Sequence, residues 1–457
     1  MLTVPAPTTE TARLADRYAE VRAQTERLCD GLQTEDYVVQ SMEDVSPTKW
    51  HLAHTTWFWE TFVLTPHAEG YALYDERYPY LFNSYYVQAG ERHCRAQRGY
   101  LSRPTVEEVL AYRRHVTEAM GRFLDGFDEA ERPDVADVVE VGLHHEQQHQ
   151  ELMVTDLKHV FSVNPLRPAY RERPATRAAD PGPLGWRPFE AGLHEIGRAP
   201  GGASSRDRFH FDNEGPRHRQ FVEAFRIADR LVTCGEYLRF MEDGGYGRAP
   251  LWLSLGWAAR EANGWTEPFY WENRDGEWWH YTLAGMRPVD PAEPVVHLSY
   301  FEADAYARWA DAAGVYPGAR LPSEAEWEVA ARTVWDGAGE PPGSFVGSGR
   351  FHPAPAHPTA VGWPPAGGDG APAAAPLRQM FGEVWQWTHS QYSPYPGYRP
   401  LAGALGEYNG KFMANQFVLR GGSVATPRDH VRLTYRNFFP PDATWQFTGL
   451  RLASSPS

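Results

Sequence analysis

Apolar residues recur at the spacing of an α-helix along the first 165 residues of the chain. This pattern predicts four helices, over residues 11–32, 47–66, 105–127 and 134–162. Thr105 and Glu108 have the spacing of a capping box at the start of the third helix, Pro66 closes the second, and the fourth begins at Asp134 or Asp137. Four helices of this length predict an antiparallel bundle.

The pattern changes after the fourth helix. Residues 166–186 are rich in Pro, Arg and Ala and predict an inter-domain linker. Beyond them Gly, Pro and Trp are dense, the apolar runs are short, and the clearest helices are SYFEADAYARWADAAG and LPSEAEWEVAART. Residues 353–376, rich in Pro, Gly and Ala, predict a surface loop. We therefore expect an α+β protein with a helical domain at 1–165, a linker, and a mixed domain at 187–457.

Composition narrows the classes of function. The net charge of −15 argues against nucleic acid or an anionic membrane as the main partner. The sequence has neither a basic start followed by an apolar run nor a long uncharged apolar stretch, so neither a signal peptide nor a membrane span is expected. Its three cysteines are far apart, which fits a reducing compartment and predicts a cytoplasmic protein.

The predicted fourth helix carries His145-Glu146-Gln147-Gln148-His149, which matches the HExxH signature of zinc metalloproteases. The two histidines are four residues apart, so both imidazoles project from one helical face and can share a metal ion. Glu146 points about 100° away from its histidine neighbour, so outside the protease interpretation it is expected to serve structure or the surroundings of the ligands rather than to act as a general base.

A protease would need a further ligand after this motif. Leu152 and Thr155 stand where one protease family has Gly and His, and the next glutamate, Glu172, lies in the predicted linker. The second predicted helix instead offers His51 and His54. His54 would complete a set of three neutral imidazoles that leaves open positions on the metal. Such a set suits iron or zinc, and the spacing does not choose between them.

The motifs LAH, HEQQHQE, LPSEAEWEVAAR, FGEVWQWT, VLRGGS, YRNFF and TGLRLA, in this order, resemble the ergothioneine-biosynthesis sulfoxide synthases over nearly the whole chain. This resemblance implies a DinB-like four-helix bundle followed by a C-type-lectin-like domain similar to the formylglycine-generating enzymes. It also implies an Fe(II) enzyme that uses O₂ to join the sulfur of cysteine or γ-glutamylcysteine to C2 of the hercynine imidazole, as a sulfoxide.

Several residues acquire roles from the resemblance alone. The iron ligands would be His54, His145 and His149, and Gln148 would hold the substrate imidazole. Tyr85 and Tyr86 of NSYY match a branch of the family in which paired tyrosines near iron supply a proton.

The other branch, specific for γ-glutamylcysteine, has its tyrosine in the second domain. Its nearest match here is Leu405, three residues before Tyr408, and leucine cannot donate a proton. The resemblance therefore favours the branch with paired tyrosines.

Substrate-binding residues are implied in both domains. Arg95 and Arg98 resemble a pair that grips the carboxylate of the sulfur substrate, with Arg92 as an alternative member. Asn437, Phe438 and Phe439 are candidates for a wall that faces the trimethylammonium group of hercynine.

Residues 235–457 contain no cysteine, whereas formylglycine-generating enzymes need a pair, so that activity is not expected. Two other enzymes fit parts of the pattern: a selenoneine synthase that takes hercynine and a selenosugar, and a zinc-dependent DinB-like hydrolase. A hercynine-binding protein without turnover is the alternative from a different class. Fe(II) is the expected cofactor of the leading interpretation, and small molecules are its expected partners.

Overall fold

The computed structural model describes residues 13–173, 180–201, 204–356, 376–400, 406 and 408–455. They divide into two compact units. The first contains the described residues up to Met153 together with Gly201–Phe209, and the second contains those of Val154–Pro200 and His210–Ser457.

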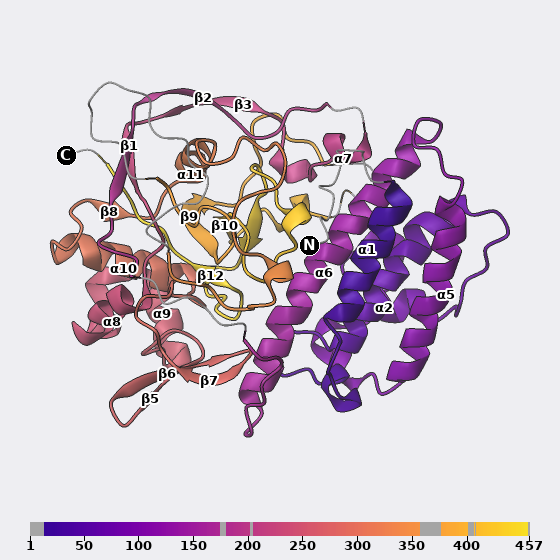
Figure 1. The fold of residues 1–457 in the computed structure, drawn as a ribbon, viewed down its shortest axis with the longest axis horizontal. Helices are drawn as coiled ribbons and strands as arrows, with labels where there is room; N and C mark the ends of the chain where they lie inside the picture. Colours follow the sequence, from indigo (N-terminus) through magenta and orange to yellow (C-terminus); the bar gives the residue numbers. More distant parts are fainter. Residues whose placement is uncertain are drawn as a thin grey trace, which may run out of the picture. The chain divides into compact units, whose positions relative to one another are not determined.

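The first unit is the predicted helical bundle. Its long helices are α1 (Leu14–Arg27), α2 (Thr48–Trp59), α5 (Val106–Leu124) and α6 (Pro133–Val163), of which α6 continues into the second unit. α2 and α1 both pack against α5, as Figure 1 shows. The side chain of Gln150 on α6 donates to the Val21 carbonyl of α1 over 2.9 Å. The four predicted helices are therefore confirmed.

The helix ends follow local chemistry. The capping box of α5 is present, with Glu108 N donating to Thr105 Oγ1 over 3.2 Å. The second helix, predicted to close at Pro66, ends one residue later. α2 passes into a π-helix, η2 (Glu60–Leu64), and then into α3 (Thr65–His67), which contains Pro66. Proline lacks an N–H and its ring clashes with the preceding turn, so the helical run ends beside it.

The connection between α3 and α5 has short helical turns of its own. These are α4 (Tyr78–Phe82), η3 (Val87–Ala89) and η4 (Arg95–Tyr100). α4 packs against α2, so this connection lies on the bundle beside the helix that carries His54.

The second unit combines small sheets with helices, which confirms the α+β prediction. One sheet has the strand order β1 (Trp186–Phe189), β4 (Phe225–Ala228), β13 (Ala453–Ser454), β8 (Ala319–Arg320). Another has the order β11 (Asn437–Phe439), β10 (Phe417–Arg420), β9 (Trp385–Gln391), β12 (Thr448–Gly449). Its β9 and β12 run parallel, whereas the other neighbours in both sheets are antiparallel.

Two smaller sheets and several helices complete this unit. β2 (Gly192–Ile196) pairs with β3 (His218–Val222), and β5 (Trp271–Arg274), β6 (Glu277–Thr282) and β7 (Gly285–Pro288) form a three-stranded sheet. The two helices predicted here are confirmed as α10 (Tyr300–Ala312) and α11 (Glu324–Ala331). The structure adds α8 (Cys234–Glu242) and α9 (Ser254–Asn263), which the sequence pattern did not single out.

Five of the motifs that carry the family resemblance lie in the second unit and meet there. Arg420 of VLRGGS donates to Glu324 over 3.0 Å and to Glu328 over 2.6 Å, both carboxylates coming from LPSEAEWEVAAR. Arg436 of YRNFF donates to the same Glu324 over 2.7 Å. Because a buried charge is costly without its partner, these residues hold one another in place.

A second buried contact links two further motifs to LPSEAEWEVAAR. The side-chain oxygen of Gln386, in FGEVWQWT, accepts from the Trp327 indole over 3.0 Å and from Arg451 of TGLRLA over 2.9 Å. All three side chains are buried. The motifs by which this part of the sequence is recognised therefore form the buried core of the second unit.

The first residues of the segment 353–376, which the sequence predicted to be a surface loop, are not at the surface. Residues 353–356 are buried, with Ala354 and Ala356 only 5% and 3% exposed, and Ala354 N donates to Glu383 over 2.8 Å. The expectation of a surface position is therefore wrong for these residues, because they pack into the unit. Residues 357–375 lie outside the described part of the chain.

Candidate metal centre

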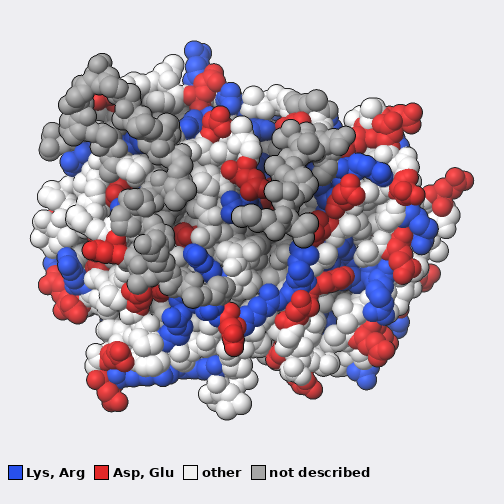
Figure 2. Space-filling model, viewed as in Figure 1, with Lys and Arg blue, Asp and Glu red and all other residues white. Residues whose placement is uncertain are grey.

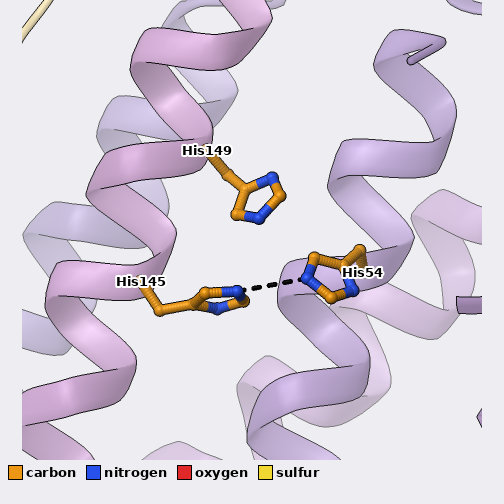
Figure 3. A group of neighbouring side chains, drawn as sticks. All are labelled: His54, His145 and His149. Carbon is orange, nitrogen blue, oxygen red and sulfur yellow. Dashed lines mark hydrogen bonds between the residues drawn. The ribbon is translucent and has the colours of Figure 1, made fainter. Parts of the chain in front are cut away.

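Three buried histidines meet inside the bundle. His145 and His149 project from one face of α6 and His54 from α2, which faces it (Figure 3). The three are 1%, 9% and 0% exposed, respectively. One ring nitrogen from each lies within 4.8 Å of those of the other two. The structure thus brings together the three histidines that the sequence singled out as metal ligands.

Neighbouring groups set the orientation of these rings. His54 Nδ1 lies 2.5 Å from the carbonyl oxygen of Phe82 at the end of α4, so it carries a proton and donates it. This leaves His54 Nε2 with a lone pair, directed at His145 Nε2 over 3.1 Å. His149 Nδ1 lies 2.8 Å from Nδ1 of His51, a turn before His54 on α2. Backbone or side-chain partners of this kind orient the histidines of metal sites.

The three rings are held in the uncharged form. Burial lowers the pKa of His145 to about 3. Burial, and after it the neighbouring histidines, lower the pKa of His54 and of His149 well below the usual value. Neutral imidazoles offer lone pairs at neutral pH, which is the state that metal binding requires.

The nitrogen positions fit a shared metal ion. Imidazole nitrogens bind such ions at about 2.1 Å, so two ligands at roughly a right angle lie about 3 Å apart. The separation between His54 Nε2 and His145 Nε2 is 3.1 Å. An all-imidazole set accepts iron, zinc and related ions, so the residues fit a metal without choosing which one.

Glu146, between the two histidines of α6, points away from them. Its carboxylate accepts from Arg22 over 3.0 Å, Arg113 over 2.8 Å, Thr25 over 2.7 Å and the Trp59 indole over 2.8 Å. Both oxygens are occupied in this buried network, so Glu146 is no general base for the histidine cluster. It fills the structural role expected from its position on the helix.

The paired tyrosines lie beside the histidines. The Tyr85 and Tyr86 rings stack with centroids 4.6 Å apart, and their hydroxyl oxygens are 3.5 Å apart. Tyr86 is fully buried, with its ring centroid 6.5 Å from that of His145, whereas Tyr85 is half-buried. The Asn83 side chain donates to the Tyr86 carbonyl over 2.9 Å and so shapes this turn.

Of the two predicted arginines, the structure brings Arg98 to the histidines. Its guanidinium carbon lies 3.3 Å from the ring centroid of Trp50, which stacks on His54 at 4.5 Å. Arg98 is buried and also donates to Ser46 over 2.8 Å. Trp50 is thus a contact residue of the cluster that sequence reasoning missed, although its place four residues before His54 on a helix was a usable signal.

Arg95 and Gln148 take different positions. The Arg95 side chain is 55% exposed and pairs with Asp44, with Nη1 3.9 Å from Oδ1. Gln148 is half-buried and precedes His149 on α6. Arg95 and Arg98 therefore have different surroundings, because the turn of η4 points Arg98 inward and leaves Arg95 at the surface.

The predicted substrate wall lies in the second unit. Asn437, Phe438 and Phe439 form β11 and are half-buried. Phe438 stacks on Tyr392 with centroids 4.0 Å apart, so one face of its ring is covered. Tyr408 is buried against Phe211 at 5.1 Å, and Leu405 lies outside the described residues. Contact of the wall with hercynine stays a prediction.

One face of the molecule shows how the described charged side chains are distributed. On the face drawn in Figure 2, acidic and basic side chains are interspersed. Among the residues that the structure describes, no helix has the length and apolar character needed to cross a membrane. The expected absence of a nucleic-acid partner stays a prediction.

Both parts of the chain match known families. Residues 17–153 match the DinB superfamily, and residues 190–456 match the family described as sulfatase-modifying factor enzyme 1-like domain. These matches confirm a DinB-like bundle followed by a domain similar to formylglycine-generating enzymes.

Full-length relatives share both parts. A hercynine oxygenase from Mycolicibacterium thermoresistibile is 33% identical, with 97% of this chain and 94% of that protein covered. One from Mycobacterium tuberculosis is also 33% identical, with 97% of this chain and 99% of that protein covered. A formylglycine-generating enzyme of Mycobacterium tuberculosis is 30% identical but covers only 44% of this chain and 76% of its own length.

Proposed function

The chain belongs to the hercynine oxygenase family, and we propose that it uses Fe(II) and O₂ to join a thiol to C2 of the hercynine imidazole as a sulfoxide. The thiol in this proposal is cysteine or γ-glutamylcysteine. The reaction converts one C–H bond, one S–H bond and O₂ into a C–S bond, an S=O bond and water. O₂ accepts the four electrons that the two substrates lose, so no other reductant is needed.

The observation that carries the proposal is the cluster of three neutral, buried imidazoles beside a stacked tyrosine pair. His54, His145 and His149 would hold the iron. Bound there, iron(II) supplies redox chemistry toward O₂ and open positions for the thiol and the hercynine imidazole. No carboxylate belongs to the set, so these three ligands would not offset the positive charge of a bound metal ion, which could then attract an anionic thiolate.

Tyr86 is proposed as the proton donor. Its phenol is buried within the ring layer around His145, where a proton on Oη is kept from bulk water. Tyr85 is half-buried, and its hydroxyl lies 3.5 Å from that of Tyr86, so it can return a proton to Tyr86 Oη from outside. A positioned phenol of this kind is a general acid.

Arg98 is proposed to hold the carboxylate of the thiol substrate. It is the buried member of the predicted arginine pair, and its side chain lies on Trp50, next to His54. A guanidinium forms strong, directed hydrogen bonds to a carboxylate. Gln148, adjacent to His149, is proposed to hold the hercynine imidazole. The residues of β11 are proposed to contact its trimethylammonium group.

The test is product formation with matched substrates. The chain is loaded with Fe(II) without oxygen, mixed with hercynine and cysteine, γ-glutamylcysteine or a selenosugar, and then exposed to O₂. The proposal expects a sulfoxide with one of the thiols by mass spectrometry. Product from the selenosugar alone would identify a selenoneine synthase instead. Zinc retained through chelation, with no oxygen consumed, would identify a hydrolase.

A further inference from the structure

A second group of metal-binding side chains is buried in the unit that contains the sheets. His280 lies on β6, Glu293 follows β7, and His352 follows η8 (Val346–Ser348). The three are 3%, 3% and 2% exposed. One ligand atom from each lies within 4.8 Å of those of the other two. Three separate segments of the chain thus converge on one buried point.

The contacts within this group are those of ligands to one ion. His352 Nε2 lies 2.9 Å from Glu293 Oε2, and the His280 and His352 rings meet edge to face with centroids 4.9 Å apart. Nitrogen and oxygen ligands bind such ions at about 2.1 Å, so two of them at roughly a right angle are about 3 Å apart. The observed 2.9 Å matches that separation.

An ion pair with Glu293 does not explain why two histidines are buried beside this carboxylate. Glu293 already has a cation, because Arg173 Nη2 donates to its other oxygen, Oε1, over 2.5 Å. Both histidines are buried beside this ion pair. Among the described residues, His352 Nδ1 is buried without a hydrogen-bond partner. Burying two polar rings beside an ion pair costs desolvation.

We propose that His280, Glu293 and His352 bind a divalent transition-metal ion, with zinc(II) the best match to two imidazoles and one carboxylate. Zinc sites in proteins use this combination of ligands. Arg173 would hold the oxygen of Glu293 that does not bind the ion, as partners of ligating carboxylates do. The ion would tie β6 to the segments around Glu293 and His352. This site lies in a different unit from the three bundle histidines and is independent of the proposed sulfoxide chemistry.

The positively charged side chains nearby do not exclude the binding of a metal cation at His280, Glu293 and His352. The charges of Glu293 and Arg173 cancel, so the group starts neutral, as a set of three histidines does. Two further cations act on the histidines: Lys158, whose Nζ lies 2.6 Å from Nε2 of His297, and Arg287, which pairs with His280 across β6 and β7. Burial lowers the pKa of Lys158 to about 7, so much of its charge is absent at neutral pH.

The backbone beside the site is strained. Phe351, which precedes His352, has a φ of 48°, in the left-handed region that a bulky residue rarely adopts. Such a conformation persists where the surroundings impose it. An ion that binds His352 would be one such constraint.

The test is a count of bound metal in the full chain, with cobalt(II) as a spectroscopic probe. Metal-free wild type, the double variant His145→Ala/His149→Ala, His352→Gln, Glu293→Gln and the control His389→Gln are titrated without oxygen. His389 is exposed in the same unit. We expect two equivalents for wild type and for the control, and one for each of the other variants. Circular dichroism establishes that each variant is folded.

Two results would overturn the site. One is that the bundle double variant binds no cobalt. The other is that the His352→Gln and Glu293→Gln chains keep both equivalents. If both single variants fail to fold, X-ray absorption on the zinc-loaded bundle double variant decides the matter. Scattering from about two imidazoles supports the site, and its absence contradicts it. Because sulfoxide formation is assayed separately, either failure is distinct from a failure of the proposed function.

Discussion

Glu146 and Arg113 form a fully buried ion pair, in which Arg113 Nη2 donates to Glu146 Oε1 over 2.8 Å. Arg22 occupies the other carboxylate oxygen over 3.0 Å. Burial by itself would raise the pKa of Glu146, but the charges of the two arginines hold it well below its usual value. The residue that a zinc protease would use as its base is therefore a permanent anion that fastens α6 to α1 and α5.

Replacing Glu146 by Gln should destabilise the fold rather than remove a catalytic group. Arg22 and Arg113 would lose their buried counter-ion, which costs about 3–5 kcal/mol. Urea unfolding measures this loss, and the exposed Glu118→Gln on α5 is the matched control. A variant with wild-type stability and no activity would point to catalysis by Glu146 instead.

Tyr86→Phe should slow sulfoxide formation without releasing iron. Removal of a general acid costs roughly 10²–10⁴ in rate, and we expect a smaller loss for Tyr85→Phe, which acts through Tyr86. Initial rates by mass spectrometry and iron content per chain separate the two effects. Tyr80→Phe, in the same connection but 45% exposed, should behave like wild type. Loss of iron from Tyr86→Phe would mean that the phenol supports the metal site rather than the chemistry.

Arg98 and Arg95 should differ sharply although they are three residues apart. Arg98→Lys removes the planar fork and should raise the KM for the thiol about tenfold or more, since a charged hydrogen bond contributes about 1.5–3 kcal/mol. Arg95→Lys should leave the KM within twofold, because Arg95 is exposed and bound to Asp44. Equal effects of the two changes on KM would contradict the assignment of Arg98.

Glu302 should give the second unit a pH-dependent stability. Burial raises its pKa to about 7, and Tyr246 donates to its Oε1 over 2.6 Å. Between about pH 4.5 and 7 the folded chain keeps a proton that the unfolded chain has released. The free energy of unfolding should therefore fall as the pH rises through this window, by up to about 3 kcal/mol.

Unfolding at pH 5 and pH 8 measures that change. Glu302→Gln should abolish the part of this change in unfolding free energy that Glu302 contributes. Glu261→Gln, on an exposed turn of α9, should leave the whole change in place. An unchanged pH profile in Glu302→Gln would show that this carboxyl is ionised throughout.

The sequence predicted the parts of the site that lie on regular helices. Helical spacing placed His145 and His149 on one face, and the capping box marked the start of α5. It did not predict the Phe82 carbonyl that orients His54, because this contact depends on how the connection folds back onto α2. The sequence also did not predict that Arg98 is buried whereas Arg95 is exposed, because this difference follows from the direction of a single short turn.

In the second unit, the recognisable motifs proved to be the buried core around Glu324 and Gln386. Short strands such as β8 and β13 have too few residues to show an alternating pattern, so their pairing could not be read from the sequence. The same holds for the group at His280 and His352, whose members are 72 residues apart and become neighbours only in the fold.

The proposed role of the three bundle histidines is to hold iron that couples O₂ to C–S bond formation. The most direct measurement is one turnover of the Fe(II)-loaded chain with hercynine and cysteine or γ-glutamylcysteine under ¹⁸O₂. We predict a product that joins both substrates, has lost two hydrogens and contains one ¹⁸O atom, with one O₂ consumed per product. A chain that holds iron at these histidines yet forms no such product with either thiol would contradict it.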